Sequence, residues 1–299
     1  MNINKQNVSK AEEIFELAKN DMLSFGKLFL ADDFMRSETP WFHYEIADDI
    51  MNHDKKQPIG EVYSCLQGEG KYIGIPHILI RVTGCRLRCQ FKDSFCDTPY
   101  ASWKPEKGNF TLEEILEFYE NNPQINHTMI TGGGPTIHPA LLKELCIIGK
   151  QYNHTVTIET EGSEFVQTVA DCISLSPKLA NSTPIPGTWM PYANREVTEK
   201  DKQQHEKWRT NYHVMQQLIS NHDDYQIKPV ISNEDDLEEV KYIQQVLDVP
   251  DDKIWLMPEG ITEEELNTRR KWLMEIAVNE GYNFTDRLHI IAYGDKRGV

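Results

Sequence analysis

The stretch RVTGCRLRCQFKDSFCDTPYASW, residues 81–103, follows a run of apolar β-forming residues and holds three of the six cysteines of this 299-residue chain. Cys85, Cys89 and Cys96 have the spacing C-x3-C-x6-C, with no fourth cysteine or histidine close by. Thiolates are soft ligands, so a loop of this kind can bind zinc or an iron–sulfur cluster, or can bind nothing. Zinc sites usually have four ligands in C-x2-C pairs, whereas three ligands leave one metal position open.

Composition limits the possible classes of protein. The chain is 39% hydrophobic and 26% charged, with no apolar stretch long enough to span a bilayer. Its first 21 residues, MNINKQNVSKAEEIFELAKND, lack the features of a signal peptide, so we expect a cytoplasmic protein with no membrane partner. The net charge of −16 and the absence of a basic stripe argue against direct nucleic-acid binding. In a reducing compartment we assign Cys65, Cys146 and Cys172 to packing.

From about residue 59 onward, short β-rich runs alternate with helical stretches, as in a parallel sheet with crossover helices. Helix starts at Thr111 and Thr262 have capping-box spacing to Glu114 and Glu265. The even spacing predicts an α/β fold built of βα repeats. The expected strands are HILIRVTG (77–84), HTMIT (127–131), HTVTIET (154–160), CISLS (172–176), YQIKPVIS (225–232), KIWLM (253–257) and RLHIIAY (287–293).

Two segments lie outside this pattern. Residues 1–58 are predicted to form a helical, polar N-terminal extension. Residues 180–215 read as an insertion that leads into a charged helix over 199–218, EKDKQQHEKWRTNYHVMQQL. The repeating domain is therefore expected to cover residues 59–299.

The cysteine loop resembles the cluster loop of the radical S-adenosylmethionine superfamily, in which the open iron of a 4Fe-4S cluster binds the cofactor. The flanking sequence is similar to that of the 7-carboxy-7-deazaguanine synthase family, and the match covers roughly residues 59–299 in the family's order. It implies a modified, incomplete (β/α) radical SAM barrel. The matching motifs are YSCLQGEGKYIGIPHILIRVTGC, CDTPYASW, ITGGGP, ETEG, ISLSPK, YQIKPV, LMPEG and RLHIIAYGDKRGV.

The resemblance implies a set of substrate-binding residues. In the family, the QGEG motif and the arginine of the first barrel strand hold a pterin, which points to Gln67, Glu69 and Arg81. A carboxylate can pair with the donor edge of the heterocycle, and an arginine fork can bind its carboxyl group. The threonine of TGG and the histidine of the terminal motif extend the set to Thr131 and His289.

The resemblance also implies the cofactor contacts. Cys85, Cys89 and Cys96 would hold the 4Fe-4S cluster, Thr98 of CDT would bind Mg²⁺, and Ser176 of SPK would lie beside S-adenosylmethionine. Members of the family often have C-x3-C-x2-C, and we interpret the four extra residues here as tolerated, since this loop varies in length among the synthases.

The glycine motif departs from the superfamily pattern. Residues 132–135 read GGGP, whereas the superfamily usually has GGEP, whose acidic residue helps to hold the ammonium group of the cofactor. Gly134 cannot make that contact. The backbone carbonyls of Gly132 and Gly133 are expected to accept hydrogen bonds from the ammonium. A carboxylate on the next strand, Glu159 or Glu161, would supply the charge.

The resemblance also implies a reaction. The family converts 6-carboxy-5,6,7,8-tetrahydropterin to 7-carboxy-7-deazaguanine with loss of ammonia, through a 5′-deoxyadenosyl radical that takes hydrogen from C6. The enzyme would be a carbon–nitrogen lyase of 7-deazapurine biosynthesis, leading to preQ0 and queuosine or to modified DNA bases. It would need a reducing donor such as a flavodoxin or ferredoxin, and family members are homodimers.

Two other functions remain open from the residues alone. A radical SAM activase of a glycyl-radical enzyme would keep the cluster loop but would not need QGEG, CDTP and the terminal RLH together. A non-catalytic barrel scaffold, with Gly134 marking lost cofactor affinity, would neither assemble a cluster nor cleave S-adenosylmethionine.

Overall fold

The computed structural model describes residues 55–92 and 94–299. The chain separates into two compact units, residues 1–57 with 110–115 and residues 58–109 with 116–299. Almost all of the predicted N-terminal extension, residues 1–58, lies outside the described residues and stays a prediction. Everything that concerns the site belongs to the second unit.

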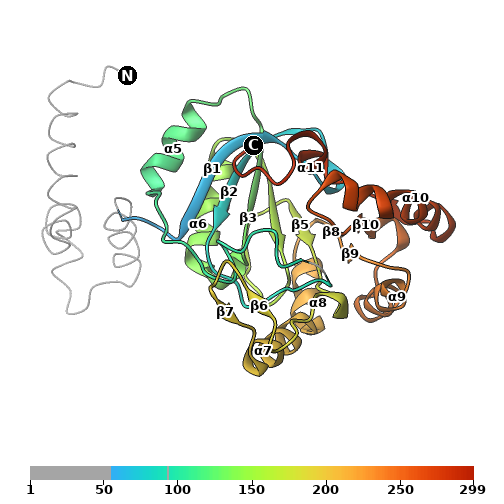
Figure 1. Ribbon diagram of the computed structural model, residues 1–299. Coiled ribbons are helices and arrows are strands. Elements are labelled where there is room, and N and C mark those ends of the chain that lie inside the picture. The colour runs from blue at the N-terminus through green and yellow to red at the C-terminus, as the bar shows by residue number, and fades with distance from the viewer. Residues whose placement is uncertain (1–54, 93) are drawn as a thin grey trace, which may run out of the picture. The chain divides into compact units, whose positions relative to one another are not determined.

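A six-stranded sheet forms the centre of the second unit, in the order β1-β2-β3-β4-β5-β8 (Figure 1). The strands from β2 onward pair in parallel, whereas β1, which the sequence did not predict, pairs antiparallel to β2. The carboxyl ends of the parallel strands therefore meet at one edge. The strands are β1 (Ile59–Leu66), β2 (Pro76–Val82), β3 (His127–Gly132), β4 (Thr155–Thr160), β5 (Cys172–Leu175) and β8 (Asp224–Ile227).

A second, three-stranded parallel sheet continues the fold in the order β11-β10-β9. The single strand expected over 225–232 is split, since β8 ends at Ile227 and β9 begins at Val230 in this other sheet. Pro229 lies at the break, where it has no amide hydrogen to give to a ladder. A lone parallel bridge from Ile227 to Ile254 links the two sheets. The result is the predicted modified, incomplete barrel; its further strands are β9 (Val230–Ile231), β10 (Trp255–Pro258) and β11 (Asn283–Phe284).

The prediction of a strand over 287–293 is wrong. This segment forms helix α11 (Leu288–Tyr293), with local bonds such as Gly294 N to Ile290 O at 2.8 Å. Of its six residues only Ile290 is buried, so the segment is half-exposed and does not have the two-sided burial of a central strand. The helix is anchored by the amide of Leu288, which donates to Gly68 O at 2.9 Å.

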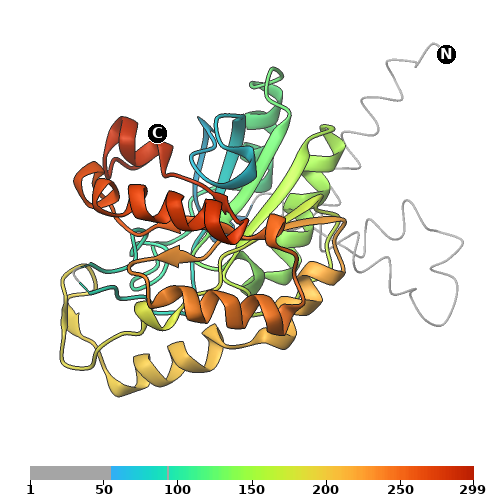
Figure 2. The ribbon, with the colours of Figure 1, turned by 90° about the vertical axis from the view of Figure 1, so that its right-hand side faces the viewer.

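The other helices lie outside the main sheet, as the ribbon shows from two sides (Figures 1 and 2). Helix α6 packs on β3 and β4, and α8 packs on β5 and α9. Both predicted capping boxes are present, with Thr262 Oγ1 accepting from Glu265 N and Thr111 Oγ1 from Glu114 N, each at 3.2 Å. These helices are α5 (Leu112–Glu120), α6 (Pro139–Gln151), α7 (Glu199–Arg209), α8 (Tyr212–Ser220), α9 (Asp236–Leu247) and α10 (Glu263–Glu280).

The segment predicted as an insertion, residues 180–215, forms secondary structure elements of its own. A short hairpin of β6 (Trp189–Met190) and β7 (Arg195–Glu196) leads into α7. The predicted single helix over 199–218 is two helices, because Asn211 leaves the helical path and its side-chain amide donates to Ser163 O at 3.1 Å. Met190 packs with Trp103 in a small apolar cluster that also contacts Cys96.

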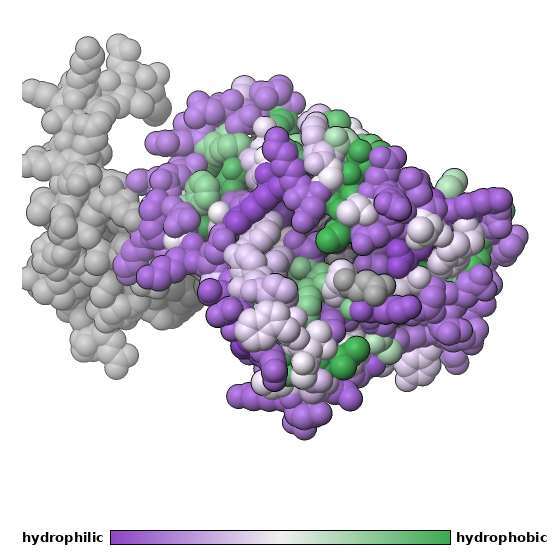
Figure 3. All heavy atoms as spheres, viewed as in Figure 1, coloured by the Kyte–Doolittle hydropathy of each residue, from purple (hydrophilic) through white to green (hydrophobic). Residues whose placement is uncertain are grey.

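The surface is mainly polar. Hydrophilic side chains cover most of the face seen in Figure 3, in keeping with the excess of acidic residues. Within the described part of the chain, none of the helices combines the length and the apolar character that crossing a bilayer requires.

Candidate functional site

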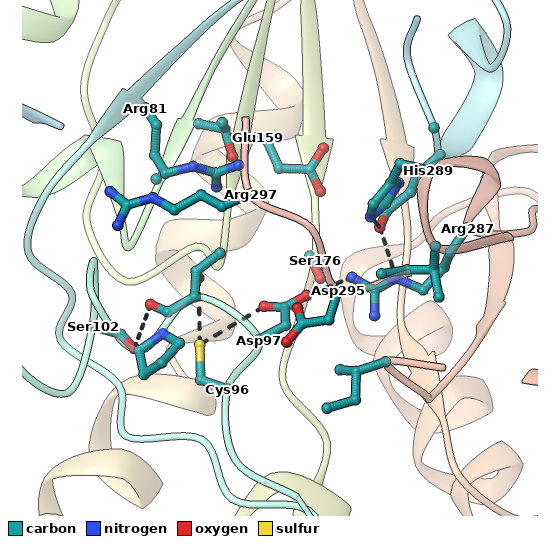
Figure 4. A pocket seen from close by; sticks show the side chains of 18 of the residues that line it. Arg81, Cys96, Asp97, Ser102, Glu159, Ser176, Arg287, His289, Asp295 and Arg297 are labelled. Atoms are coloured by element: carbon teal, nitrogen blue, oxygen red, sulfur yellow. Dashed lines mark hydrogen bonds and ion pairs between the residues drawn. The ribbon is translucent and has the colours of Figure 1, made fainter. Parts of the chain in front are cut away.

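A cavity of about 490 Å³ opens at the carboxyl ends of the parallel strands. Every site residue expected from the sequence lines it, although these residues span more than 200 positions of the chain (Figure 4). They are Gln67, Glu69, Arg81, Cys85, Cys89, Cys96, Thr98, Thr131, Gly132, Gly133, Glu159, Ser176 and His289.

The parallel sheet explains this convergence. Cys85 follows β2, Gly133 follows β3, Glu161 follows β4 and Ser176 follows β5, so each lies just past the end of a neighbouring strand. Within a strand the side chains alternate between two faces. In β2, for example, Arg81 points into the cavity, and the residues on either side of it are turned away.

The cysteine loop is held by backbone contacts. Leu87 N lies 3.3 Å from Cys85 Sγ, and Cys96 N donates to Cys89 O at 3.2 Å. The indole of Trp103 donates to the same carbonyl of Cys89 at 3.1 Å. The loop therefore returns on itself and brings the third cysteine back beside the second, despite six intervening residues.

The thiols fit an iron–sulfur cluster better than a single metal ion. Among residues 55–92 and 94–299, no three His, Cys, Asp or Glu side chains are grouped closely enough to hold one ion. A 4Fe-4S cluster has a different requirement, because each cysteine binds a different iron. Burial raises the pKa of Cys85 and of Cys89, so their thiolate forms need a positive centre nearby.

Thr98 offers a hard oxygen ligand at the same end of the cavity. Its hydroxyl lies 3.5 Å from Cys96 Sγ. The carboxylates of Asp97 and Asp295 lie close together in the same cavity (Figure 4), and burial together with Asp97 raises the pKa of Asp295. Oxygen donors of this type suit Mg²⁺, so the residues present are compatible with the ion that the resemblance implies.

Glu69 lies at the centre of a buried charge network. Lys228 pairs with its Oε2, and Arg287 Nε lies 3.0 Å from its Oε1. Burial alone would raise the pKa of Glu69, but Lys228 and then Arg287 hold it well below its usual value. Arg287 also pairs with Asp97 of the cysteine loop. One acidic group thus connects the first turn after β1 with the C-terminal motif.

Arg81 is held at a fixed orientation. Its Nε donates to Glu61 Oε2 at 2.6 Å, and its side chain is 14% exposed. Burial would lower the pKa of Arg81, yet Tyr100, Tyr63 and Glu61 raise it, so the guanidinium is always charged. This leaves a positively charged fork at the cavity wall that can bind an anion.

The remaining substrate candidates are Gln67, His289 and Thr131. Gln67 Nε2 lies 2.8 Å from Met129 Sδ, and its Oε1 accepts from Gly68 N at 2.8 Å. A Cβ on Gly68 would collide with the ring of His289, which explains the glycine. Burial lowers the pKa of His289, so the ring is neutral at pH 7. Thr131 also lines the cavity, from the end of β3.

The three glycines at the end of β3, Gly132 to Gly134, form a tight turn. A Cβ on Gly132 would collide with Val82 O, and one on Gly133 would collide with the carbonyl of Gly84. Gly134 N donates to that same Gly84 carbonyl at 2.8 Å. Packing against the end of β2 is therefore sufficient reason for two of the glycines.

The two carboxylates proposed to replace the missing acid behave differently. Glu159 Oε1 lies 2.7 Å from Lys228 Nζ, so its charge is already paired. Glu161 is 4% exposed and lies against the glycine turn, and it accepts from Ser163 Oγ at 2.6 Å. Burial raises the pKa of Glu161. Burial and then Glu161 raise the pKa of Cys85, so this carboxylate lies near that thiol.

Some residues of the site were not assigned from the sequence. Lys228, Arg287 and Asp97 all lie within motifs that were recognised, YQIKPV, RLH and CDTP. Lys228 could have been found from the sequence, since a charged residue within an apolar strand needs a partner. Ser176 lines the cavity, and its Oγ accepts from Lys178 Nζ at 2.6 Å; its expected place beside S-adenosylmethionine stays a prediction.

The chain was compared with solved structures and known families. The crystal structure of QueE from Escherichia coli matches 78% of this chain and 94% of its own with a TM-score of 0.52 and 20% identity. The fold is that of the radical S-adenosylmethionine enzymes with a modified, incomplete barrel. No protein-family model matches the chain.

Curated relatives define the family. A 7-carboxy-7-deazaguanine synthase of Rhodopirellula baltica is 36% identical over 85% of this chain and 93% of the relative. That of Halobacterium salinarum is 34% identical over 80% of this chain and 91% of the relative. The chain belongs to the 7-carboxy-7-deazaguanine synthase family.

Proposed function

We propose that the chain converts 6-carboxy-5,6,7,8-tetrahydropterin to 7-carboxy-7-deazaguanine with loss of ammonia, as a radical SAM carbon–nitrogen lyase. The observation that carries this proposal is the shared cavity, which the three cysteines and the expected pterin-binding residues line together. Membership of the synthase family supports the same assignment.

The substrate would be held at both ends. Glu69, ionised, would accept from the donor edge of the pterin, and Gln67 would add an amide beside it. Arg81 would bind the carboxyl group with its fork. The Nε2 of neutral His289 lies 3.9 Å from Glu69 Oε1. This imidazole would contact the pterin ring from the side of the C-terminal motif.

The cofactors would lie at the cysteine end. Cys85, Cys89 and Cys96 would hold a 4Fe-4S cluster, and Thr98 would hold Mg²⁺. Glu161 and Ser176 would accept hydrogen bonds from the amino-acid part of S-adenosylmethionine. When bound, the cluster and this cofactor supply the radical that removes hydrogen from the substrate. The residues of the chain would fix the position of C6 and exclude water.

The partners follow from the reaction. A one-electron donor such as a flavodoxin or ferredoxin would reduce the cluster, and the product would enter 7-deazapurine biosynthesis, for queuosine or for modified DNA bases. Two copies of the chain would form a homodimer, as in the family.

The test is an anaerobic reconstitution with iron and sulfide, followed by addition of dithionite, S-adenosylmethionine, Mg²⁺ and the pterin. The expected result is 7-carboxy-7-deazaguanine, identified by mass, with loss of product in Cys85→Ala and retention in Cys146→Ala. A cluster that yields 5′-deoxyadenosine without ring contraction would contradict the substrate assignment. A protein that assembles no cluster would contradict the enzyme assignment and favour a scaffold.

A further inference from the structure

Lys228 is a buried lysine that connects two carboxylates from distant parts of the chain. Its side chain is 1% exposed, with Nζ 2.7 Å from Glu159 Oε1 and paired as well with Glu69 Oε2. Its backbone is fixed just past β8, where Lys228 N donates to Leu175 O at 2.7 Å. The sequence assigned no role to this residue.

The ionisation states of three buried groups in contact, here one ammonium and two carboxylates, depend on one another. A buried ammonium is costly unless it is paired, and two neighbouring carboxylates do not both stay ionised unless a cation lies between them. Burial would lower the pKa of Lys228, but Glu159 and then Glu69 raise it. Lys228 is therefore charged, and its ammonium forms ion pairs with both Glu69 and Glu159.

The two cationic side chains that pair with Glu69 come from different parts of the fold. Lys228 comes from the end of β8 and holds Oε2, whereas Arg287, directly before α11, holds Oε1. With both oxygens held, the carboxylate plane is fixed while each oxygen keeps a free lone pair for a substrate donor. The charged and titratable groups that face Glu69 are Lys228, Arg287, His289 and Asp97.

We propose that Lys228 is a positioning residue for the reaction: it keeps Glu69 ionised and oriented for the substrate, and Glu159 is the counterion that holds Lys228 in place. This proposal rests on the proposed function, in which Glu69 binds the donor edge of the pterin. It gives Glu159 a role on the substrate side of the cavity rather than at the cofactor.

The test measures kcat and KM against pH in the reconstituted holoenzyme for Lys228→Met, Lys228→Arg and Glu159→Gln. Without the ammonium, Glu69 ionises only at higher pH, so Lys228→Met should move the acidic limb of kcat/KM upward by about one unit or more. At neutral pH its KM for the pterin should rise about tenfold, with kcat less affected. Lys228→Arg keeps a cation on Glu69 and should leave the limb in place. Glu159→Gln keeps that cation but removes the counterion of Lys228, so it should raise KM for the pterin without moving the limb upward.

Two outcomes would overturn the proposal. A loss in Lys228→Met that is equal at every pH would mean that Lys228 only fills space. If Lys228→Met does not fold, the double variant Lys228→Met/Glu159→Gln removes a charge of each sign, and an acidic limb that does not move in it would be equally decisive. Failure of the proposed function is a separate result, because there the wild-type holoenzyme itself makes no product.

Discussion

The carboxylate of Glu161 occupies the space that a side chain on Gly134 would need. A Cβ placed on Gly134 would lie 2.5 Å from Glu161 Oε1 and 2.7 Å from Oε2. The two residues follow β3 and β4, which are neighbours in the sheet. The chain thus lacks the acid of the usual GGEP motif and has a buried acid from the next strand at the same place.

This relationship predicts that a carboxylate at position 134 can replace the carboxylate of Glu161. Gly134→Glu alone should weaken cofactor binding, because the new side chain displaces the carboxylate of Glu161 and adds a second buried acid beside it. The pair Gly134→Glu/Glu161→Ala should recover it, since residue 134 has φ of −150°, which any residue adopts. Glu161→Gln should weaken S-adenosylmethionine binding about tenfold or more, the cost of one charge-assisted hydrogen bond. Titration calorimetry of the cluster-loaded protein measures all three.

The control for that experiment is Glu159→Gln, because the carboxylate of Glu159 in the wild type is already paired with Lys228. Its affinity for S-adenosylmethionine should remain close to that of the wild type. A double variant that binds no better than Gly134→Glu would show that Glu161 and residue 134 are not interchangeable.

Iron binding should depend on three cysteines only. Cys85→Ala, Cys89→Ala and Cys96→Ala should each lose the electron paramagnetic resonance signal of the reduced 4Fe-4S cluster. Cys146→Ala and Cys172→Ala, at fully buried positions away from the cavity lining, should keep it. Iron and sulfide analysis checks the result, and full iron content in Cys96→Ala would disprove the predicted spacing.

The C-terminal segment should be needed for substrate affinity. Arg297 pairs with Glu61 and Glu106, and its guanidinium lies 3.6 Å from the ring centroid of Tyr100. Residues 294–299 line the cavity, so this arginine keeps the end of the chain over the site. Arg297→Ala should raise KM for the pterin about three- to tenfold, a modest value because the side chain is 39% exposed. Steady-state kinetics should show no such change in Lys271→Ala, an exposed charge on α10.

The segment over 180–215 should be stabilised by Asp201. Its carboxylate closes the capping box with Thr198 and pairs with Arg195 at 2.7 Å. Asp201→Asn should lower the free energy of unfolding by about 1–2 kcal/mol. Although burial opposes it, Arg195 and Thr198 lower the pKa of Asp201 from 3.8 to about 2.

The sign of that shift sets its pH dependence. A lowered folded-state pKa means that the stabilisation is complete above about pH 4 and is lost as the pH falls towards 2. Thermal melts of the variant and the wild type should therefore converge in acid. Asp252→Asn, on an exposed turn, is the control and should melt like the wild type at every pH. A constant difference down to pH 2 would contradict this account.

Local patterns in the sequence were sufficient for much of the fold. Apolar runs bounded by turn residues located β2 to β5, and capping residues located the starts of two helices, because both signals act over a few neighbouring residues. Segments 225–232 and 287–293 were less well predicted. Whether an apolar run becomes a strand or a helix at the end of a domain depends on which partner it meets.

The sequence by itself determined the family, the cysteine loop and the residues that face the cavity, because parallel strands bring their carboxyl ends together whatever the intervening chain. Only the tertiary structure decided how the charges are shared. Lys228 lies between Glu69 and Glu159, and Glu161 rather than Glu159 lies against Gly134. Ion pairing depends on distances of a few ångströms between residues far apart in the chain, and such distances are set by packing and not by spacing along the sequence.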